Sequence, residues 1–402
     1  MELLKINKIG KTVNGIVQIT GSKSETNRLL ILQQFYPNLI IKNISNSDDS
    51  VLMQKALTST SNEINIGHAG TAMRFLTSYF AVKEGAEIVL TGSPRMKERP
   101  IKILVEALKS LGANIEYLEQ EGFPPLKISG KKLTNSYVEI EGNVSSQYIS
   151  SLLLIGATLK NGLKLKFKGE ITSVPYIKMT LTLLAELGIE LSWDDDSITI
   201  HPKPSISSKT IVVESDWSSA SYYYSLCALS PNSEITLSAY KESSLQGDSV
   251  LAEIYKNFGV ETTFGENTIT LKNKHITYNF PTLNLKSAPD IAQTIAVTCF
   301  GLGIECYLTG LHTLKIKETD RLVALKTEIE KLGGEVEITN ETLLLKASSK
   351  IKENISIATY HDHRMAMAFA PLALKVPIVI EDADVVSKSY PTFWSDFDKV
   401  TN

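Results

Sequence analysis

An amphipathic helical pattern recurs four times along this chain of 402 residues, each time ending at a glycine before a short alternating strand. The copies are EALKSLGANIEY (106–117), LLAELGIELSW (183–193), EIYKNFGVETTF (253–264) and EIEKLGGEVEI (328–338). Their glycines, at intervals of 76, 71 and 74 residues, are Gly112, Gly188, Gly259 and Gly333. Glycine suits this position because it adopts the left-handed conformation of a helix C-cap without steric cost. The pattern therefore predicts four helix–turn–strand units.

A second helix, rich in apolar and small residues and followed by a turn and a strand, recurs with the same period. Its copies span 73–90, 149–167, 221–237, 294–308 and 365–380, with 27–44 as a shorter sixth. One such unit cannot bury its own helices, so three must pack around a shared core. We therefore expect an α/β (α+β) fold of two domains, each built from three βαβαββ-like repeats, with a boundary near 212–217.

Composition and charge exclude several classes of protein. With 41 basic and 44 acidic residues the net charge is −3, so no global field favours nucleic acid or an anionic membrane. The three cysteines show no C-x-x-C spacing, which argues against a disulfide framework or a zinc site and for a reducing compartment. No apolar signal region begins the chain, and no segment approaches the ~18 apolar residues of a membrane span. We expect a cytoplasmic protein without metal or cofactor.

Polar stretches precede all six copies of the second helix. They are GSKSETNR (21–28), GHAGTAMR (67–74), NVSSQY (143–148), SDWSSAS (215–221), SAPDIAQ (287–293) and HDHRMAM (361–367). Helix N-termini bind anions because they present unpaired N–H groups and about half a positive charge. The first stretch lacks the second glycine of a nucleotide-binding P-loop. Capping alone explains SDWSSAS, but GSKSETNR, GHAGTAMR and HDHRMAM carry more polar chemistry than capping needs.

Two charged stretches lie outside these helix starts. TGSPRMKERP (91–100) carries three cations and one acid from Arg95 to Arg99, and a charge run of this kind is usually a solvated loop. In KIKETDR (315–321), Thr319 has the position of a helix cap, but Lys317 and Arg321 are unfavourable beside a helix N-terminus. Cations at a helix start go against this charge preference, and such an exception indicates a functional site.

Seven of these motifs, in order, resemble the 5-enolpyruvylshikimate-3-phosphate (EPSP) synthase family. They are GSKS-x-x-NR, G-x-AGTAMR, PRMKERPI, SSQ, S-x-PY, KETDR and HDHRMAM, between residue 21 and Lys388. The resemblance implies pseudo-threefold domains of the inverted α/β barrel type with the active site in the interdomain cleft. It implies a domain of residues 21–214 that binds the shikimate phosphate, and a discontinuous domain of 1–20 and 215–402 with the acid/base and phosphoenolpyruvate (PEP) residues.

The reaction that the resemblance implies transfers the enolpyruvyl group of PEP to the 5-hydroxyl of shikimate 3-phosphate. It releases phosphate through a tetrahedral addition–elimination intermediate and belongs to chorismate and aromatic amino-acid biosynthesis. Both substrates are small anions, so a cationic site is needed. We expect no cofactor, and we expect the protein to be a monomer.

The resemblance also implies roles for the residues at matching positions. The catalytic set is Asp290 as base or orienter of the 5-hydroxyl, Glu318 as proton donor to the PEP methylene carbon, and Lys23 and His363. The expected ligands of shikimate 3-phosphate are Lys23, Ser24, Arg28, Ser145, Ser146, Gln147, Ser173, Tyr176, Asp290, Thr313 and Lys317. The expected ligands of PEP are Lys23, Gly70, Thr71, Arg95, Gln147, Arg321, Arg364 and Lys388. Guanidinium forks suit the carboxylate and phosphate of PEP.

The chain departs from the family pattern at His68, Phe75 and Thr313, which affects the fine detail of substrate affinity. Gly70 is unsubstituted, so we expect inhibition by glyphosate.

Three alternatives remain open. A UDP-N-acetylglucosamine enolpyruvyl transferase shares the fold but typically carries a cysteine or aspartate in the loop that corresponds to PRMKERP, where this chain has no cysteine. A non-catalytic anion-binding protein on the same fold would be expected to lose Asp290, Glu318 or Lys23, and all three are present. A nucleic-acid-processing relative is disfavoured by the lack of a basic excess.

Overall fold

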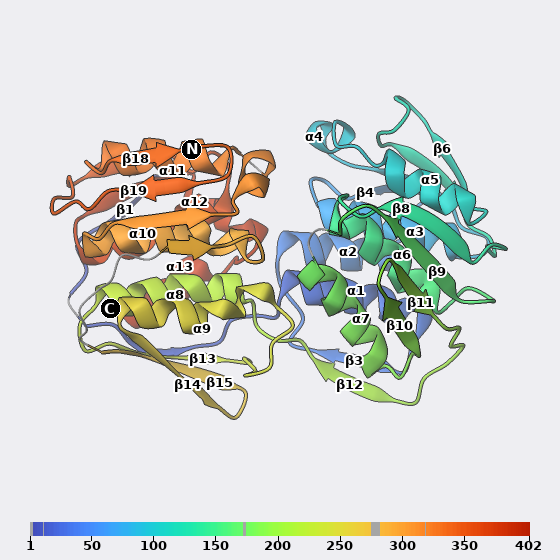
Figure 1. The fold of residues 1–402 in the computed structure, drawn as a ribbon, viewed down its shortest axis with the longest axis horizontal. Helices are drawn as coiled ribbons and strands as arrows, with labels where there is room; N and C mark the ends of the chain where they lie inside the picture. Colours follow the sequence, from blue (N-terminus) through green and yellow to red (C-terminus); the bar gives the residue numbers. More distant parts are fainter. Residues whose placement is uncertain (1–2, 11, 172–173, 275–281, 318) are drawn as a thin grey trace. The chain divides into compact units, whose positions relative to one another are not determined.

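The computed structural model describes the 402 residues except 1–2, 11, 172–173, 275–281 and 318. The chain divides into two compact units (Figure 1): residues 21–213 form one, and residues 1–20 with 214–402 form the other. Among the described residues, no helix combines the length and apolar character needed to cross a membrane.

The described part of residues 21–213 forms three sheets. Its strands are β3 (Leu39–Lys42), β4 (Glu63–Asn65), β5 (Glu87–Thr91), β6 (Asn114–Tyr117), β7 (Leu126–Ser129), β8 (Tyr137–Glu141), β9 (Leu163–Lys168), β10 (Leu191–Asp194), β11 (Ser197–Ile200) and β12 (Lys209–Val212). Its helices are α1 (Lys23–Phe35), α2 (Asp48–Thr58), α3 (Gly70–Val82), α4 (Pro94–Lys97), α5 (Lys102–Ser110), α6 (Ser146–Gly156) and α7 (Val174–Glu186). The strand orders are β4-β5-β7-β6, β10-β11-β9-β8 and β12-β3. In both larger sheets a parallel pair is extended by an antiparallel hairpin, so the same unit has been repeated.

The other unit, over its described residues, also forms three sheets. Its strands are β1 (Leu3–Ile6), β2 (Asn14–Val17), β13 (Glu234–Ser238), β14 (Val260–Gly265), β15 (Thr268–Asn273), β16 (Thr282–Asn284), β17 (Cys306–Thr309), β18 (Val336–Ile338), β19 (Leu343–Leu345), β20 (Ile355–Ile357) and β21 (Ile378–Glu381). Its helices are α8 (Trp217–Leu229), α9 (Leu251–Ile254), α10 (Ala292–Leu302), α11 (Arg321–Lys331), α12 (His363–Phe369) and α13 (Phe393–Thr401). Its 3₁₀ turns are η1 (Gly247–Val250), η2 (Tyr255–Phe258), η3 (Pro289–Ile291), η4 (His312–Ile316), η5 (Ala370–Leu374) and η6 (Ala383–Lys388). The strand orders are β14-β15-β13-β2, β16-β17-β19-β18 and β1-β21-β20, so pairing of β1 and β2 binds the N-terminus to this unit.

The copies of the second helix form the buried centre of each unit. In one unit α3 packs against α6, in the other α8 packs against α10, and nearly every residue of these helices is buried. A helix that is apolar on all sides is stable only when neighbours cover it. Buried hydroxyl pairs join these helices at the same separation of 73 residues in both units: Ser78–Ser151 (2.6 Å), Ser221–Thr294 (2.9 Å) and Ser225–Thr298 (2.8 Å). The repeat therefore extends to the contacts between helices.

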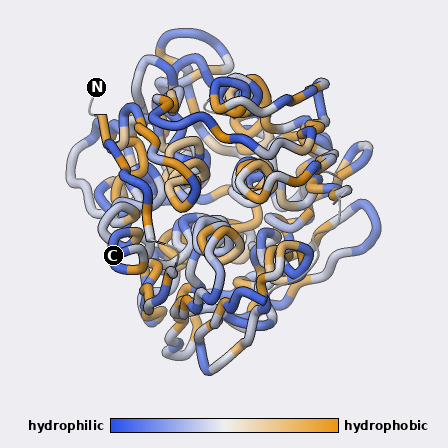
Figure 2. The backbone as a smooth tube through the Cα atoms, turned by 90° about the vertical axis from the view of Figure 1, so that its left-hand side faces the viewer, coloured by the Kyte–Doolittle hydropathy of each residue, from blue (hydrophilic) through white to orange (hydrophobic). Residues whose placement is uncertain are grey.

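The fold prediction is confirmed as a mixed α/β architecture with three sheets in each unit. Across the described strands the sheets of a unit stay separate and do not close into one barrel. The four C-cap glycines have φ of +105°, +72°, +78° and +99°, as the left-handed cap requires. In Figure 2 many of the hydrophilic residues lie in the outer loops, whereas many of the hydrophobic residues lie in the helices.

Candidate active site

Three predicted polar stretches form helix starts in the unit of residues 21–213. α1 begins at Lys23, α3 at Gly70 and α6 at Ser146. Gln147 Nε2 donates to Thr71 Oγ1 over 3.3 Å, so the first turns of α3 and α6 lie together. Their partial positive charges therefore add, which favours an anion at this edge of the unit.

The SSQ motif forms the cap and first turn of α6. Ser145 is the N-cap, and its hydroxyl accepts the Gln147 N–H over 3.3 Å. Ser146 is buried, and Gln147 is partly buried and bound to Thr71 as described above. Ser173, the next expected phosphate ligand, lies outside the described residues.

Arg28 is held inside the unit by hydrogen bonds. Its Nε donates to Thr180 Oγ1 over 2.7 Å, Nη1 to the Ser24 carbonyl over 2.7 Å, and Nη2 to Ser150 Oγ over 3.0 Å and to the Tyr176 carbonyl over 3.3 Å. Burial lowers its pKa to about 10, although Tyr176 and Glu25 oppose this. Among the described residues, four of its five N–H groups have hydrogen-bond partners, and the remaining donor is on Nη1.

Lys23 stands at the first position of α1 and is partly buried. Within the described chain no carboxylate lies at ion-pair distance from its ammonium group. A lysine at a helix start adds its charge to that of the helix, so this position favours a bound phosphate or carboxylate over any internal partner.

The two arginines of the PRMKERP stretch have different surroundings in the structure. Arg95 is 78% exposed and pairs with Glu98 at 2.6 Å. The stretch is not only a loop, since Pro94–Lys97 form the one-turn helix α4, capped by Ser93, and its turn directs Arg95 to solvent. The guanidinium of Arg99 lies against Gly70, where an added Cβ would be 2.6 Å from Nη1. Arg95 stays the predicted PEP ligand, and Arg99, four residues on, is a second guanidinium that lies at the start of α3.

A second cationic cluster lies in the other unit, around Asp290 of η3. Asp290 Oδ1 accepts Arg321 Nη1 at 2.8 Å and lies 3.4 Å from Lys317 Nζ, and Oδ2 accepts Arg364 Nη2 at 3.3 Å. Four residues that the sequence predicts for one site, though up to 74 positions apart, thus come together. Burial by itself would raise the pKa of Asp290, but the charges of Arg364, Lys317 and Arg321 bring it well below its usual range.

The starts of α11 and α12 supply the arginines of this cluster. Asp362, the N-cap of α12, accepts the Arg364 N–H at 2.9 Å and Arg321 Nε at 2.6 Å. Asp320, rather than the predicted Thr319, caps α11, because its carboxylate accepts the N–H groups of Leu322 and Val323, both at 3.2 Å. Arg321 is 2% exposed, so its charge is fixed in place by Asp362 and Asp290.

The remaining predicted residues of this unit have more varied positions. His363 is buried beside Asp362, with 3.8 Å between its Nδ1 and Oδ1. Thr313 lies in η4, which packs against η3. Lys388 ends η6, which packs against α12. Glu318 lies outside the described residues.

Sequence reasoning missed a chain of hydrogen bonds that links Asp248, in the segment SLQGDS (244–249), to Arg364. Ser218 Oγ donates to Asp248 Oδ2 at 2.5 Å and accepts Arg364 Nη2 at 3.3 Å. Burial, followed by the charge of Asp290, raises the pKa of Asp248 to about 7, although Arg364 opposes this. SDWSSAS, in which Asp216 is the cap, therefore also supplies a contact to the cationic cluster. No local pattern around Asp248 signals this pairing.

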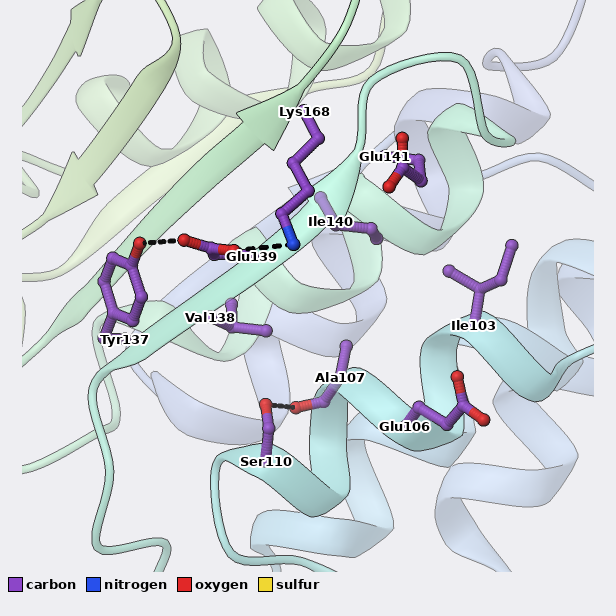
Figure 3. Close-up of a pocket in the computed structure, with 10 residues that line it drawn as sticks. All are labelled: Ile103, Glu106, Ala107, Ser110, Tyr137, Val138, Glu139, Ile140, Glu141 and Lys168. Carbon is purple, nitrogen blue, oxygen red and sulfur yellow. Dashed lines mark hydrogen bonds and ion pairs between the residues drawn. The ribbon is translucent and has the colours of Figure 1, made fainter.

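A groove of about 500 Å³ lies elsewhere in the unit of residues 21–213 (Figure 3). Lys168 Nζ meets Glu139 at 2.7 Å, and Glu139 also accepts the Tyr137 hydroxyl at 2.6 Å. With Glu106 and Glu141 on its lining, the groove carries more negative than positive charge. It contains none of the predicted site residues and does not suit an anionic substrate. Across the described part of the chain, no group of three or more His, Cys, Asp or Glu residues could hold a metal ion.

The fold is that of the enolpyruvyl transferases. EPSP synthase from Acinetobacter baumannii superposes with a TM-score of 0.82 at 20% identity, covering 100% of this chain and 98% of that one. The enolpyruvyl transferase NikO from Streptomyces tendae gives a TM-score of 0.75 at 14% identity, over 99% and 97% of the two chains.

The sequence comparisons are more specific. A family model described as EPSP synthase (3-phosphoshikimate 1-carboxyvinyltransferase) matches residues 38–397. The chain is 46% identical to the 3-phosphoshikimate 1-carboxyvinyltransferase of Bacteroides fragilis (strain YCH46), over 96% of this chain and 95% of that protein. It is 34% identical to the enzyme of the same name from Histophilus somni (strain 2336), over 100% and 99%. The chain belongs to the EPSP synthase family and is an enzyme, so the non-catalytic and nucleic-acid alternatives are not favoured.

Proposed function

We propose that the chain transfers the enolpyruvyl group of PEP to the 5-hydroxyl of shikimate 3-phosphate and releases inorganic phosphate. Family membership supports the reaction, and the cations at the helix starts suit substrates with two phosphates and two carboxylates. The main observation in support of the residue assignment is that the carboxylate of Asp290 forms ion pairs with Lys317, Arg321 and Arg364. Such a cluster can bind a phosphorylated carboxylic acid and hold a carboxylate close to it.

The reaction proceeds by addition and elimination. The 5-hydroxyl oxygen bonds to C2 of PEP while C3 gains a proton and becomes a methyl group. The C2–O bond to phosphate then breaks, and the methyl group loses a proton to restore the double bond. We assign the hydroxyl proton to Asp290. Protonation of C3 stays assigned to Glu318 by family resemblance alone, since that residue lies outside the described chain.

The low pKa of Asp290 has a consequence for this assignment. A carboxylate whose pKa is far below neutrality is a weak base. PEP bound to Arg364 and Arg321 would share the positive charge that now acts on Asp290. Its pKa would therefore rise when substrate binds, so the base becomes stronger only in the loaded enzyme.

We assign the binding of shikimate 3-phosphate to the unit of residues 21–213, through Lys23, Ser24, Arg28 and the SSQ motif at the start of α6. By resemblance, Arg95 together with Gly70 and Thr71 contacts PEP, and Arg99 adds a cation beside Gly70. The supporting observations are the paired helix starts of α3 and α6 and the position of Arg99 against Gly70. Tyr176 and Ser173 complete the phosphate ligands by resemblance, and Thr313, His363 and Lys388 complete the set in the other unit.

The deciding experiment measures phosphate release from PEP with shikimate 3-phosphate, with UDP-N-acetylglucosamine and without acceptor. We expect release only with shikimate 3-phosphate. Release with the nucleotide sugar instead would replace the proposed acceptor. We further propose that the enzyme is a cytoplasmic monomer, and a sedimentation mass twice that of the 44.3 kDa chain would contradict the monomer.

A further inference from the structure

Glu328, in α11, is a buried carboxylate to which the proposed reaction gives no role. Its side chain is fully buried, and a carboxylate is costly to bury without partners. Its Oε1 accepts the Tyr360 hydroxyl over 2.6 Å, and its Oε2 accepts the Ala358 N–H over 3.2 Å. The Lys331 ammonium donates to both oxygens, over 2.9 and 2.8 Å. Two of these three partners thus belong to one short segment, residues 358–361, which leads into α12.

This segment contains two successive residues in the left-handed conformation. Tyr360 has φ of +54° and His361 has φ of +55°. A residue with a Cβ is unfavourable in this region, so the conformation persists only where surrounding contacts fix it. Directly after the turn, Asp362 caps α12 and Arg364 stands in its first turn. The path of the turn therefore sets where the helix that carries this arginine begins.

Strand pairing and an exposed ion pair also hold the segment. Pairing of β20 with β21 reaches Ile357 and ends before the turn begins. His361 Nδ1 lies 3.0 Å from Asp382 Oδ2, but the imidazole is 86% exposed, and exposed pairs contribute little in water. Among the described contacts, Glu328 is therefore the buried side chain that bonds to the turn between the end of β20 and the cap of α12.

Arg321 and Glu328 bind the two ends of the same segment from one face of α11. They are seven residues apart, which is close to two helical turns and a rise of about 10 Å. Arg321 Nε donates to Asp362 Oδ2 over 2.6 Å, and the Asp362 N–H donates to the Thr359 carbonyl over 2.9 Å. Because α11 holds the segment at two points, the starts of α11 and α12 keep a fixed separation, and so do Arg321 and Arg364.

We propose that Glu328 is a positioning residue that fixes the left-handed turn before α12 and so places Arg364 beside Arg321. The inference rests on the proposed function, in which these two arginines bind PEP. Glu328 touches neither substrate in this scheme, and no catalytic or ligand assignment includes it or Tyr360. Loss of its bond to the turn lets the turn relax. The apparent affinity for PEP then falls in proportion to the fraction of molecules that keep both arginines in place.

The test compares Tyr360→Phe with the wild-type chain by steady-state phosphate release in both substrates. The ring stays, and Glu328 keeps its bonds to Ala358 and Lys331, so the fold is kept. A hydrogen bond to a charged group corresponds to about tenfold or more in an equilibrium constant. Because other contacts also hold the turn, we expect KM for PEP to rise about three- to tenfold. The values of kcat and of KM for shikimate 3-phosphate should stay within about twofold.

Tyr137→Phe is the matched control, because the Tyr137 hydroxyl also donates to a glutamate, Glu139 Oε1, over 2.6 Å. The two tyrosines are similarly exposed, 47% for Tyr137 and 37% for Tyr360. The control bond lies in the groove of Figure 3, which contains none of the predicted site residues. Tyr137→Phe should therefore leave all three kinetic constants unchanged.

A second variant tests the left-handed turn directly. Glycine adopts this conformation without steric cost, so His361→Gly makes the turn less dependent on Glu328. The exposed contact of the imidazole with Asp382 contributes little. In the Tyr360→Phe background, His361→Gly should return KM for PEP to within about twofold of the wild-type value. Failure to lower KM for PEP would contradict control through the turn.

Other kinetic results overturn the inference as well: an unchanged KM for PEP in Tyr360→Phe, an equal change in all three constants, or the same effect in Tyr137→Phe. Hydrogen exchange separates such a failure from failure of the proposed function. The amides of residues 358–364 should exchange faster in Tyr360→Phe than in the wild type, whichever acceptor the enzyme uses. A wild-type chain without turnover of shikimate 3-phosphate refutes the proposed function. Unchanged exchange with normal wild-type turnover refutes the inference alone.

Discussion

A methyl group added at Gly70 would lie 2.6 Å from Arg99 Nη1 and 3.0 Å from Cζ and Nη2. Gly70 is the first residue of α3 and its φ is outside the left-handed region, so alanine fits the backbone. The clash falls on the end of a flexible side chain, which can retreat by roughly 1 Å to reach ordinary contact distance. Gly70→Ala should therefore keep the fold and displace the arginine.

The magnitude follows from what Arg99 does in the proposed site. A hydrogen bond to a charged group contributes about 1.5–3 kcal/mol, and about 1.4 kcal/mol is a factor of ten. KM for PEP should rise about 10- to 150-fold in Gly70→Ala, with little change in KM for shikimate 3-phosphate. The assay is phosphate release at varied PEP.

Gly10→Ala is the matched control for Gly70→Ala, because a Cβ at Gly10 meets no atom within 4 Å. It should behave as the wild type. A KM for PEP within twofold of the wild-type value in Gly70→Ala would refute the placement of Arg99 at this helix start.

Three further outcomes test the other unit. Asp290→Asn should lower kcat by about 10²–10⁴, the usual range for a lost acid–base group, and a loss under threefold in stopped-flow phosphate release would count against its role. Glu318→Gln should lower turnover by a similar factor of about 10²–10⁴ while PEP binding, followed by calorimetry, stays near that of the wild type. Asp248 has its pKa raised to about 7, so it is neutral below that pH and anionic above it, where it competes with substrate for Arg364. KM for PEP should therefore rise as pH passes about 7, and Asp248→Asn should remove that part of the pH profile; an identical profile in the variant would exclude this effect.

The sequence predicted the repeat and the helix starts because both depend on local patterns. A glycine at a C-cap, a polar stretch before an apolar helix and an alternating strand are each encoded within a few residues. Gly112 and Gly333, for example, have φ of +105° and +99° as expected. The recurrence of these signals then identified units too small to fold alone, which is why the layered α/β architecture could be expected.

The different surroundings of Arg95 and Arg99 could not be predicted from local patterns. Both arginines lie in one charged run, and that run by itself predicts a solvated loop. The one-turn helix α4, capped by Ser93 and closed by burial of Met96, turns Arg95 to solvent and leaves Arg99 beside Gly70. That outcome depends on tertiary contacts such as the one between Met96 of α4 and Arg74 of α3, which no pattern within ten residues contains.

By itself, the sequence determined the period of the fold, the ends of its helices and the supply of cations and carboxylates. The tertiary structure alone decided which of these charges meet. Asp290, Arg321 and Arg364 lie far apart in the chain and come within 3.3 Å only because η3, α11 and α12 start on the same side of one packed core. Asp248, 116 positions before Arg364, is joined to it through the hydroxyl of Ser218. Such contacts depend on distances between elements, and the order of residues along a chain does not record those distances.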